Sequence, residues 1–375
     1  VIKVLRMKKQ IVLLGFAAAG FSTWAQSDLY ELGLQSIKND QFEEALAHFN
    51  KLIINDPKNK KALNQRGFVK NQLGDFYGAI GDYNFAVEVD STFAKAYNNR
   101  GEAKFNLGDD YGAIEDFNQA LKLNDQLIAA YNNRGFAKYN IEDLQGALFD
   151  FSKAIELDPN DADKYFNRAV VKAELEEYIS AIDDYNKSIS LNPKDPEVWS
   201  FRGVAKYNIE KVDEAIADYD KAIEMDDKDP VKYENRALAK SSKQDFEGAL
   251  TDYNRSIELY PDDPDTYNLR GVIKYNLKNS DGAIDDYSKA IELDAYNPVY
   301  YDNRALAKTA TENYKGAIQD YSYSIELYPN DPETFHQRGL AKINLGNNYD
   351  GCLDLNTAVE LGSEDASKSI REFCK

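Results

Sequence analysis

Apolar and polar positions recur along most of the chain with a 34-residue period. The segments RGFAKYN at 134–140, RGVAKYN at 202–208 and RGVIKYN at 270–276 are separated by two such periods, with related NRA segments midway between them. Columns 1 to 34, counted from Gln26, divide residues 26–365 into ten 34-residue units. A fixed period of this length indicates a repeat architecture in which each unit packs on its neighbours.

Within a unit, the apolar columns predict two packed helices. Column 8 is Gly or Ala in every unit, column 20 is Ala in nine units, and column 24 is aromatic in nine. Columns 4, 24 and 28 continue the apolar stripe at helical spacing. Small residues at columns 8 and 20 let two helices approach closely, and the ring at column 24 fills the adjoining space. We expect helix A at columns 1–14 and helix B at columns 17–31.

Helix starts and the end of the chain follow from local signals. An Asp-Pro or Asn-Pro pair, such as Asp195-Pro196, puts a capping side chain before a first-turn proline and starts helix A of the next unit. A terminal unit needs a polar outer face, so residues 366–375 are expected to form a C-terminal capping helix.

With these columns in place, the chain resembles the tetratricopeptide repeat proteins over residues 26–365. The matching features are small residues at columns 8 and 20, aromatic residues at columns 4 and 24, and prolines at column 32 such as Pro159 and Pro261. The chain departs from the family pattern at column 7, where Arg replaces Leu, and at column 11, where Lys replaces Tyr. The resemblance implies an all-α, right-handed superhelical solenoid whose A helices line a concave groove for peptides or protein partners.

Three charged columns form a ladder. Column 7 is Arg, column 11 is Lys and column 23 is Asp in nine units, and the first unit lacks all three. Arg and Lys four residues apart share one face of helix A, and column 23 lies between them along helix B. We predict that the Asp bridges both cations within a unit, as in Arg202, Lys206 and Asp218. The alternative is an array of cation sites for acidic ligands.

A second set of residues is predicted to face the groove, at columns 5, 6, 9, 12 and 13. After the first unit these positions hold four acidic and no basic residues, in a chain that is 29% charged. Asn amides can donate to and accept from a peptide backbone, and aromatic rings supply rigid contact area. The candidate groove residues are Asn99, Phe105, Asn106, Asn133, Phe136, Tyr139, Asn140, Val204, Tyr207, Asn208, Val272, Tyr275, Asn276 and Asn344. The alternative is that column 9 packs between neighbouring A helices and the Asn side chains merely contact solvent.

Residues 1–25 are predicted to be a cleaved secretory signal peptide whose start is Met7. Two lysines precede an apolar run over 11–21, and a Thr-Trp-Ala exit ends at Ala25. The run is too short to cross a bilayer comfortably, so no stable membrane insertion is expected after cleavage. The protein is therefore expected to be of an exported bacterial type, periplasmic or secreted, with an uncleaved membrane anchor as the alternative.

The two cysteines lie where they could meet. Cys352 begins the last helix B, and Cys374 lies near the end of the expected capping helix. An exported protein is in a compartment where disulfides persist. A Cys352–Cys374 disulfide and two separate thiols both remain open, because geometry decides between them.

Composition and motifs restrict the function. Asp and Glu outnumber Lys and Arg by 64 to 45, for a formal charge of −19, which argues against a nucleic-acid partner. The chain has two distant His, no GxSxG motif, no phosphate loop and no calcium loop, so no catalytic residue, metal or cofactor is expected. The predicted function is a non-enzymatic scaffold in the cell envelope that holds an extended, largely uncharged polypeptide segment. The alternatives are a solenoid that binds a small molecule or glycan, and a regulatory subunit of an enzyme on another chain.

Overall fold

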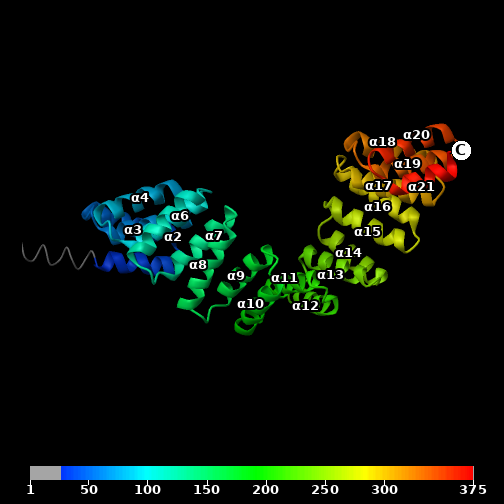
Figure 1. Cartoon of the computed structure of the whole chain (residues 1–375). Helices are drawn as coiled ribbons and strands as arrows, with labels where there is room; N and C mark the ends of the chain where they lie inside the picture. Colours follow the sequence, from blue (N-terminus) through cyan, green and yellow to red (C-terminus); the bar gives the residue numbers. More distant parts are fainter. Residues whose placement is uncertain (1–26, 375) are drawn as a thin grey trace, which may run out of the picture. The chain divides into compact units, whose positions relative to one another are not determined.

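The computed structural model describes residues 27–374, and every element in that range is a helix (Figure 1). The chain divides between Leu191 and Asn192 into two compact units, which we call the N-terminal unit and the C-terminal unit. The all-α class and the succession of helix-turn-helix pairs predicted from the sequence are confirmed.

The N-terminal unit begins with a helix over residues 27–38. It continues with α2 (Phe42–Asn55), α3 (Lys60–Gln72), α4 (Phe76–Val89), α5 (Ala94–Asn106), α6 (Asp110–Leu123), α7 (Ile128–Asn140), α8 (Leu144–Leu157), α9 (Ala162–Glu174) and α10 (Tyr178–Leu191).

The C-terminal unit consists of two series of alternating helices and a final helix. Its elements are α11 (Pro196–Asn208), α12 (Val212–Met225), α13 (Pro230–Ser242), α14 (Phe246–Leu259), α15 (Pro264–Asn276), α16 (Ser280–Leu293), α17 (Pro298–Ala310), α18 (Tyr314–Leu327), α19 (Pro332–Asn344), α20 (Asn348–Glu360) and α21 (Glu364–Phe373). From α3 to α19, odd-numbered helices are A helices and even-numbered helices are B helices. Helix α21, which packs on α20, corresponds to the capping helix expected at 366–375.

Each helix pair is shaped by its cap and its turn. At the start of α15, the Asp263 side chain accepts a hydrogen bond from the Thr266 backbone N–H, and Pro264 occupies the first turn. Between helices A and B, the residue at column 15 has a positive φ, as in Gly74 (80°) and Glu142 (62°). This left-handed residue reverses the chain so that helix B packs back on helix A.

The close approach of the two helices depends on the small column 8. A Cβ on Gly271 would lie 2.6 Å from Cε1 of Tyr287, which is buried on the facing helix B. Ala283, at column 20, belongs to the same core cluster as Tyr287. The large ring and the two small residues therefore fill one interhelical space, as their columns predict.

The predicted signal peptide at residues 1–25 lies outside the described residues. Between residues 27 and 374, no helix combines the length and the apolar character needed to cross a membrane.

Candidate functional site

The charged ladder joins helices A and B in each unit that carries it. In the C-terminal unit, Arg270 donates to Asp286 through Nε (2.9 Å) and Nη2 (2.7 Å), and Nζ of Lys274 lies 2.8 Å from the same carboxylate. The same pairing occurs at all nine ladder positions, including Arg202 and Lys206 with Asp218. The ladder Asp side chains are at most 9% exposed.

Each ladder arginine also makes contacts that the spacing did not reveal. Nη1 of Arg270 donates to Asn254 of the preceding helix B at 2.9 Å, and its guanidinium lies 5.4 Å from the Tyr267 ring centroid. Column 25 supplies equivalent acceptors elsewhere, namely Asn50, Asn84, Asn118, Ser152, Asp220, Ser288 and Ser322. One guanidinium thus links three helices and two units of the repeat, which makes the ladder interhelical rather than a set of ligand sites.

The A helices of the N-terminal unit are joined by pairs of Asn side chains. Asn99 donates to Asn64 at 3.1 Å, and Asn106 donates to Asn71 at 3.2 Å, in each case across to the preceding A helix. Asn140 donates to Asp110 of α6 at 3.1 Å, and Asn133 is half-buried. Three of the four Asn candidates in this unit therefore form hydrogen bonds between helices, which neither the groove prediction nor its alternative included.

The aromatic candidates of this unit also pack against the interior. Phe105 contacts the core cluster around Phe117, and Phe136 lies edge-on to Phe151 with ring centroids 5.3 Å apart. Tyr139 packs on the Phe151 cluster, and its hydroxyl lies 3.5 Å from Glu174. Burial and the nearby carboxylate of Glu174 raise the pKa of Tyr139.

A pocket lies between the first helix and the A helices α3 and α5. Its volume is about 270 Å³, and its walls are Leu34, Ile37, Gln65, Phe68, Lys95, Asn99 and Glu102. Desolvation by burial raises the pKa of Glu102. The pocket combines apolar walls with amide and charged groups, and only Asn99 among these residues was a candidate from the sequence.

In the C-terminal unit, the groove candidates are divided between packing and exposure. Tyr207 packs on the Tyr219 cluster, and Val272 and Tyr275 pack on the Tyr287 cluster. Asn208 and Asn276 each donate to the carbonyl four residues earlier in their own helix, at 2.9 and 3.0 Å. Val204 is 37% exposed, and Asn344 is exposed at the end of α19.

The expectation that column 5 faces the groove was wrong. Its side chains lie between neighbouring helices: Asn64, Asn98, Ser200, Asn268 and His336 are at most 9% exposed. Glu234 accepts hydrogen bonds from Ser256 (2.5 Å) and Thr266 (2.9 Å). A 100° helical step places column 5 one residue away from the exposed stripe, toward the next A helix.

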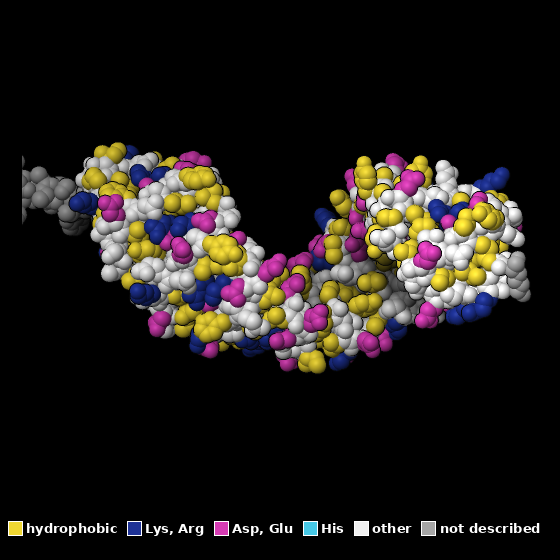
Figure 2. Space-filling model, turned by 45° about the horizontal axis from the view of Figure 1, so that its top comes forward, with side chains coloured by type: hydrophobic (Ala, Val, Ile, Leu, Met, Phe, Trp, Pro, Cys, Tyr) yellow, Lys and Arg dark blue, Asp and Glu magenta, His cyan; other side chains and the backbone are white. Residues whose placement is uncertain are grey.

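The exposed face of the A helices instead consists of columns 2, 6, 9 and 13. The candidate list missed several apolar residues on it: Val231, Leu238, Leu269, Val299 and Leu306, which are 37 to 52% exposed. An alternation with a 68-residue period at columns 2 and 6 was the signal that could have found Val231, Leu269 and Val299, whereas Leu238 and Leu306 lie at the apolar column 9. Figure 2 shows apolar side chains interspersed with acidic and basic ones over the surface in view.

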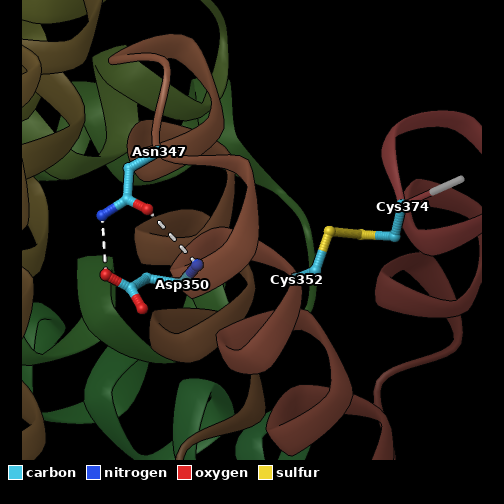
Figure 3. The surroundings of a disulfide bond; sticks show 4 residues. All are labelled: Asn347, Asp350, Cys352 and Cys374. Carbon is cyan, nitrogen blue, oxygen red and sulfur yellow. Dashed lines mark hydrogen bonds between the residues drawn. A yellow bond between two sulfur atoms is a disulfide. The ribbon is translucent and has the colours of Figure 1, made fainter.

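Cys352 of α20 and Cys374, which follows α21, form a disulfide with a Cα–Cα distance of 5.8 Å (Figure 3). Asn347, at the start of α20, accepts from the Asp350 backbone N–H in the same region. The bond ties the final helix to the last helix B.

Family models identify the kind of repeat that this chain contains. Models of the tetratricopeptide repeat match residues 94–127, 128–161, 166–230 and 264–297, and a further TPR repeat model matches residues 239–278. Together they cover more than half of the chain. No curated protein matches the sequence.

Several solved structures are similar to the chain. MamA is 29% identical and covers 43% of this chain and 95% of its own, with a TM-score of 0.42. A tetratricopeptide repeat protein from Parabacteroides merdae is 19% identical over 67% of this chain and 99% of its own, with a TM-score of 0.49. YrrB, described as a TPR protein with an unusual peptide-binding site, is 21% identical over 50% of this chain and 96% of its own, with a TM-score of 0.43.

Proposed function

The chain belongs to the tetratricopeptide repeat family, and we propose that it is a non-enzymatic scaffold of the cell envelope. In this role the exposed face of its A helices holds an extended, largely uncharged polypeptide segment of a partner protein. The observation that carries the proposal is the exposure of large apolar side chains on that face, at Val204, Leu238 and Leu306. Exposed apolar groups that gather on one face favour an interaction surface over a purely solvated one.

The positions of the charged residues support the same function, because few of them lie on the exposed face of the A helices. Ladder cations are satisfied by buried carboxylates, so the framework holds itself together without a ligand. Columns 6, 9 and 13 carry almost no charge, and they can therefore contact a peptide without first removing the water around charged groups.

The pocket of the N-terminal unit favours a peptide over a glycan. Its volume of about 270 Å³ is below the range of roughly 300–1,000 Å³ that is usual for small-molecule sites. A space of this size with apolar walls suits one side chain of a bound segment.

The binding function is tested by co-purification of a partner with the full mature chain. The variant Leu238→Ser with Leu306→Ser removes two exposed apolar contacts and should reduce the recovered partner at least tenfold. The control variant Tyr77→Ser with Tyr349→Ser changes side chains that are 78% and 76% exposed on B helices, and it should bind normally. Equal recovery with both variants, each shown to be folded by its melting curve, would place the site elsewhere.

Removing the side chains of Tyr207, Tyr275 and Asn208 together would not test the exposed face alone. Both tyrosines contact core clusters, so their loss changes stability together with the exposed face. Conservative Tyr→Phe changes at the two positions keep this packing, and they test whether the hydroxyl groups contribute to binding.

Export to the envelope is part of the proposal and has its own test. The basic start and apolar run before Ala25 support it, as does a disulfide, which is stable in an oxidising compartment. N-terminal sequencing of protein from the envelope fraction should begin at Gln26. Recovery of the protein from the cytoplasm with its N-terminus intact would reject this part of the proposal.

A further inference from the structure

We infer that the A-helix face of the C-terminal unit binds a polypeptide whose apolar side chains recur about every five to six residues, with basic side chains along one edge. This inference rests on the proposed function and changes its ligand in one respect: the bound segment is uncharged except for basic side chains along the edge that meets the starts of the A helices. It follows from three properties of the face: an apolar strip, an alternation from helix to helix, and an acidic edge.

The apolar strip is column 9. It holds an apolar residue on each of the five A helices, and three of these residues are exposed by 37 to 43%. The residues are Val204, Leu238, Val272, Leu306 and Leu340. Because they occupy the same position on successive A helices, they form a line that crosses the helices rather than following one of them.

Beside the strip, the side chains alternate between odd and even repeats. Column 6 is apolar on α11 and α15 and Asn on α13 and α17. Column 2 has the opposite phase, with acids on α11 and α15 and Val on α13 and α17. The residues concerned are Phe201, Asn235, Leu269 and Asn303 at column 6, and Glu197, Val231, Asp265 and Val299 at column 2. The face therefore repeats itself every two A helices.

This alternation fixes the spacing of the ligand. Neighbouring A helices such as α15 and α17 are in contact, and packed helix axes lie about 8–10 Å apart. Two steps span roughly 16–20 Å, and an extended chain rises about 3.3 Å per residue. Equivalent side chains of an extended ligand that crosses the helices therefore meet equivalent sites about every five to six residues.

The edge of the face at the starts of the A helices is acidic. The segments 192–197, 226–232, 260–265, 294–299 and 328–333 contain eleven acidic and three basic residues. One of the bases, Lys232, is buried and already lies within 3.1 Å of Glu197, Asp226 and Asp229. Because three carboxylates surround one ammonium group, this cluster keeps a net negative charge, and a ligand with Lys or Arg beside each apolar residue complements the edge.

The test uses synthetic peptides and the full oxidised chain. Fluorescein-labelled peptides carry three leucines in a Ser/Gly background, separated by about four, six or eight residues, with one lysine next to each leucine. Fluorescence anisotropy should show the spacing of about six binding at least tenfold more tightly than the other two, because only that spacing places every leucine beside an equivalent apolar residue of the alternating columns 2 and 6. Replacing the lysines by glutamates should weaken binding several-fold at low salt and much less at high salt.

A matched pair of variants locates the effect. Leu269→Asn introduces the residue that column 6 already carries on α13 and α17, so the helix accepts it, and it should remove most of the preference for the spacing of about six. Tyr349→Ser removes a side chain that is 76% exposed on a B helix and should leave the preference intact. Hydrogen exchange with the bound peptide should show protection on α11 to α17.

The outcomes separate this inference from the proposed function. Equal affinity at all spacings, or a preference that survives in Leu269→Asn, overturns the inference and leaves a groove that binds peptides. If none of the peptides binds and the Leu238→Ser, Leu306→Ser variant retains its partner, both proposals are rejected.

Discussion

The two units of the chain share one framework and present different faces. Their ladders pair in the same way, as Arg134 with Asp150 and Arg270 with Asp286 show. On α3, α5, α7 and α9, no large apolar side chain is exposed, whereas α11, α13, α15 and α17 each expose at least one. The edge at the starts of the A helices also differs, since the segments 56–61, 90–95, 124–129 and 158–164 contain six acidic and five basic residues.

The comparison shows that the framework and the exposed face are determined by different columns of the same A helix. Columns 7, 8 and 11 point toward helix B, columns 2, 6 and 13 point away from it, and column 9 lies at the border, where Phe136 and Val272 still contact the core. The N-terminal unit uses its face for hydrogen bonds between A helices, as in Asn99 with Asn64, and the C-terminal unit leaves much of its face apolar and open. One backbone can therefore carry two surfaces while it keeps the same ladder of Arg, Lys and Asp in its interior.

The largest expected effect tests the shared framework. Arg134→Leu and Arg270→Leu should each lower the free energy of unfolding by about 3 kcal/mol, because each removes the two-point partner of a buried carboxylate and leaves only the ladder lysine with it. Denaturant titration of each variant measures the loss. Lys153→Leu, which breaks an exposed pair with Glu156, is the control and should cost much less than either ladder variant. A loss in only one unit would mean that the two frameworks are not equivalent.

The disulfide distinguishes the units at their ends. Replacing Cys352 and Cys374 by Ser opens a link across 22 residues, and it should cost about 3 kcal/mol in the C-terminal unit. Hydrogen exchange should accelerate in α20 and α21 and stay unchanged in α3 and α4. Unchanged exchange throughout would show that the packing of α21 suffices without the bond.

Buried carboxylates on the A helices of both units make the stability of the chain depend on pH. Burial raises the pKa of Asp302 from 3.8 to about 6, and among the described residues its Oδ1 has no hydrogen-bond partner. The folded chain therefore binds this proton more tightly than the unfolded chain, and stability falls as pH rises from about 4 to about 6. Asp302→Asn, which matches Asn268 in the same column, should stabilise the chain by about 1–2 kcal/mol at pH 7, after allowance for solvent screening.

Thermal melts at two pH values check this expectation. The gain from Asp302→Asn should shrink as pH falls and vanish at about pH 3, below the pKa of 3.8 in the unfolded chain and of about 6 in the folded chain, where Asp302 is protonated in both states. In the N-terminal unit burial also raises the pKa of Glu102, so Glu102→Gln should act in the same direction. A gain that persists at the lower pH would assign it to hydrogen bonding by the new amide instead of to the lost charge.

The smallest effect concerns the turns, where the units should agree. Glu142 and Glu312 have φ values of 62° and 59°, a left-handed conformation that disfavours a side chain. Replacing either residue by Gly should stabilise by about 0.5 kcal/mol, because relief of strain exceeds the added freedom of the unfolded chain. Matched melting curves of the two single variants would show equal gains, and a loss in either would show that its Glu has a stabilising contact.

Much of the framework could be predicted from the sequence, and much of the face could not. The columns predicted the helix ends to within a few positions and the ion-paired triplet of Arg202, Lys206 and Asp218. Both depend on spacing within one 34-residue repeat. The acceptors at column 25, the buried position of column 5 and the Asn64–Asn99 bond all involve contacts between neighbouring 34-residue repeats. Helical spacing within a unit does not specify how far the next unit is rotated, and these contacts depend on that rotation.

The bond from ladder arginines such as Arg270 to column 25 of the preceding helix B has a consequence for how the gene can evolve. Column 25 is Asn, Asp or Ser in every unit, so a unit can be joined to any other and still supply the acceptor. Recombination between equivalent positions two units apart would then leave the same junction on both sides of the exchange. We expect descendants of this gene to differ by whole blocks. Each gain or loss of a block would lengthen or shorten the apolar strip by one period of its ligand. The contacts between repeats in the interior would stay the same.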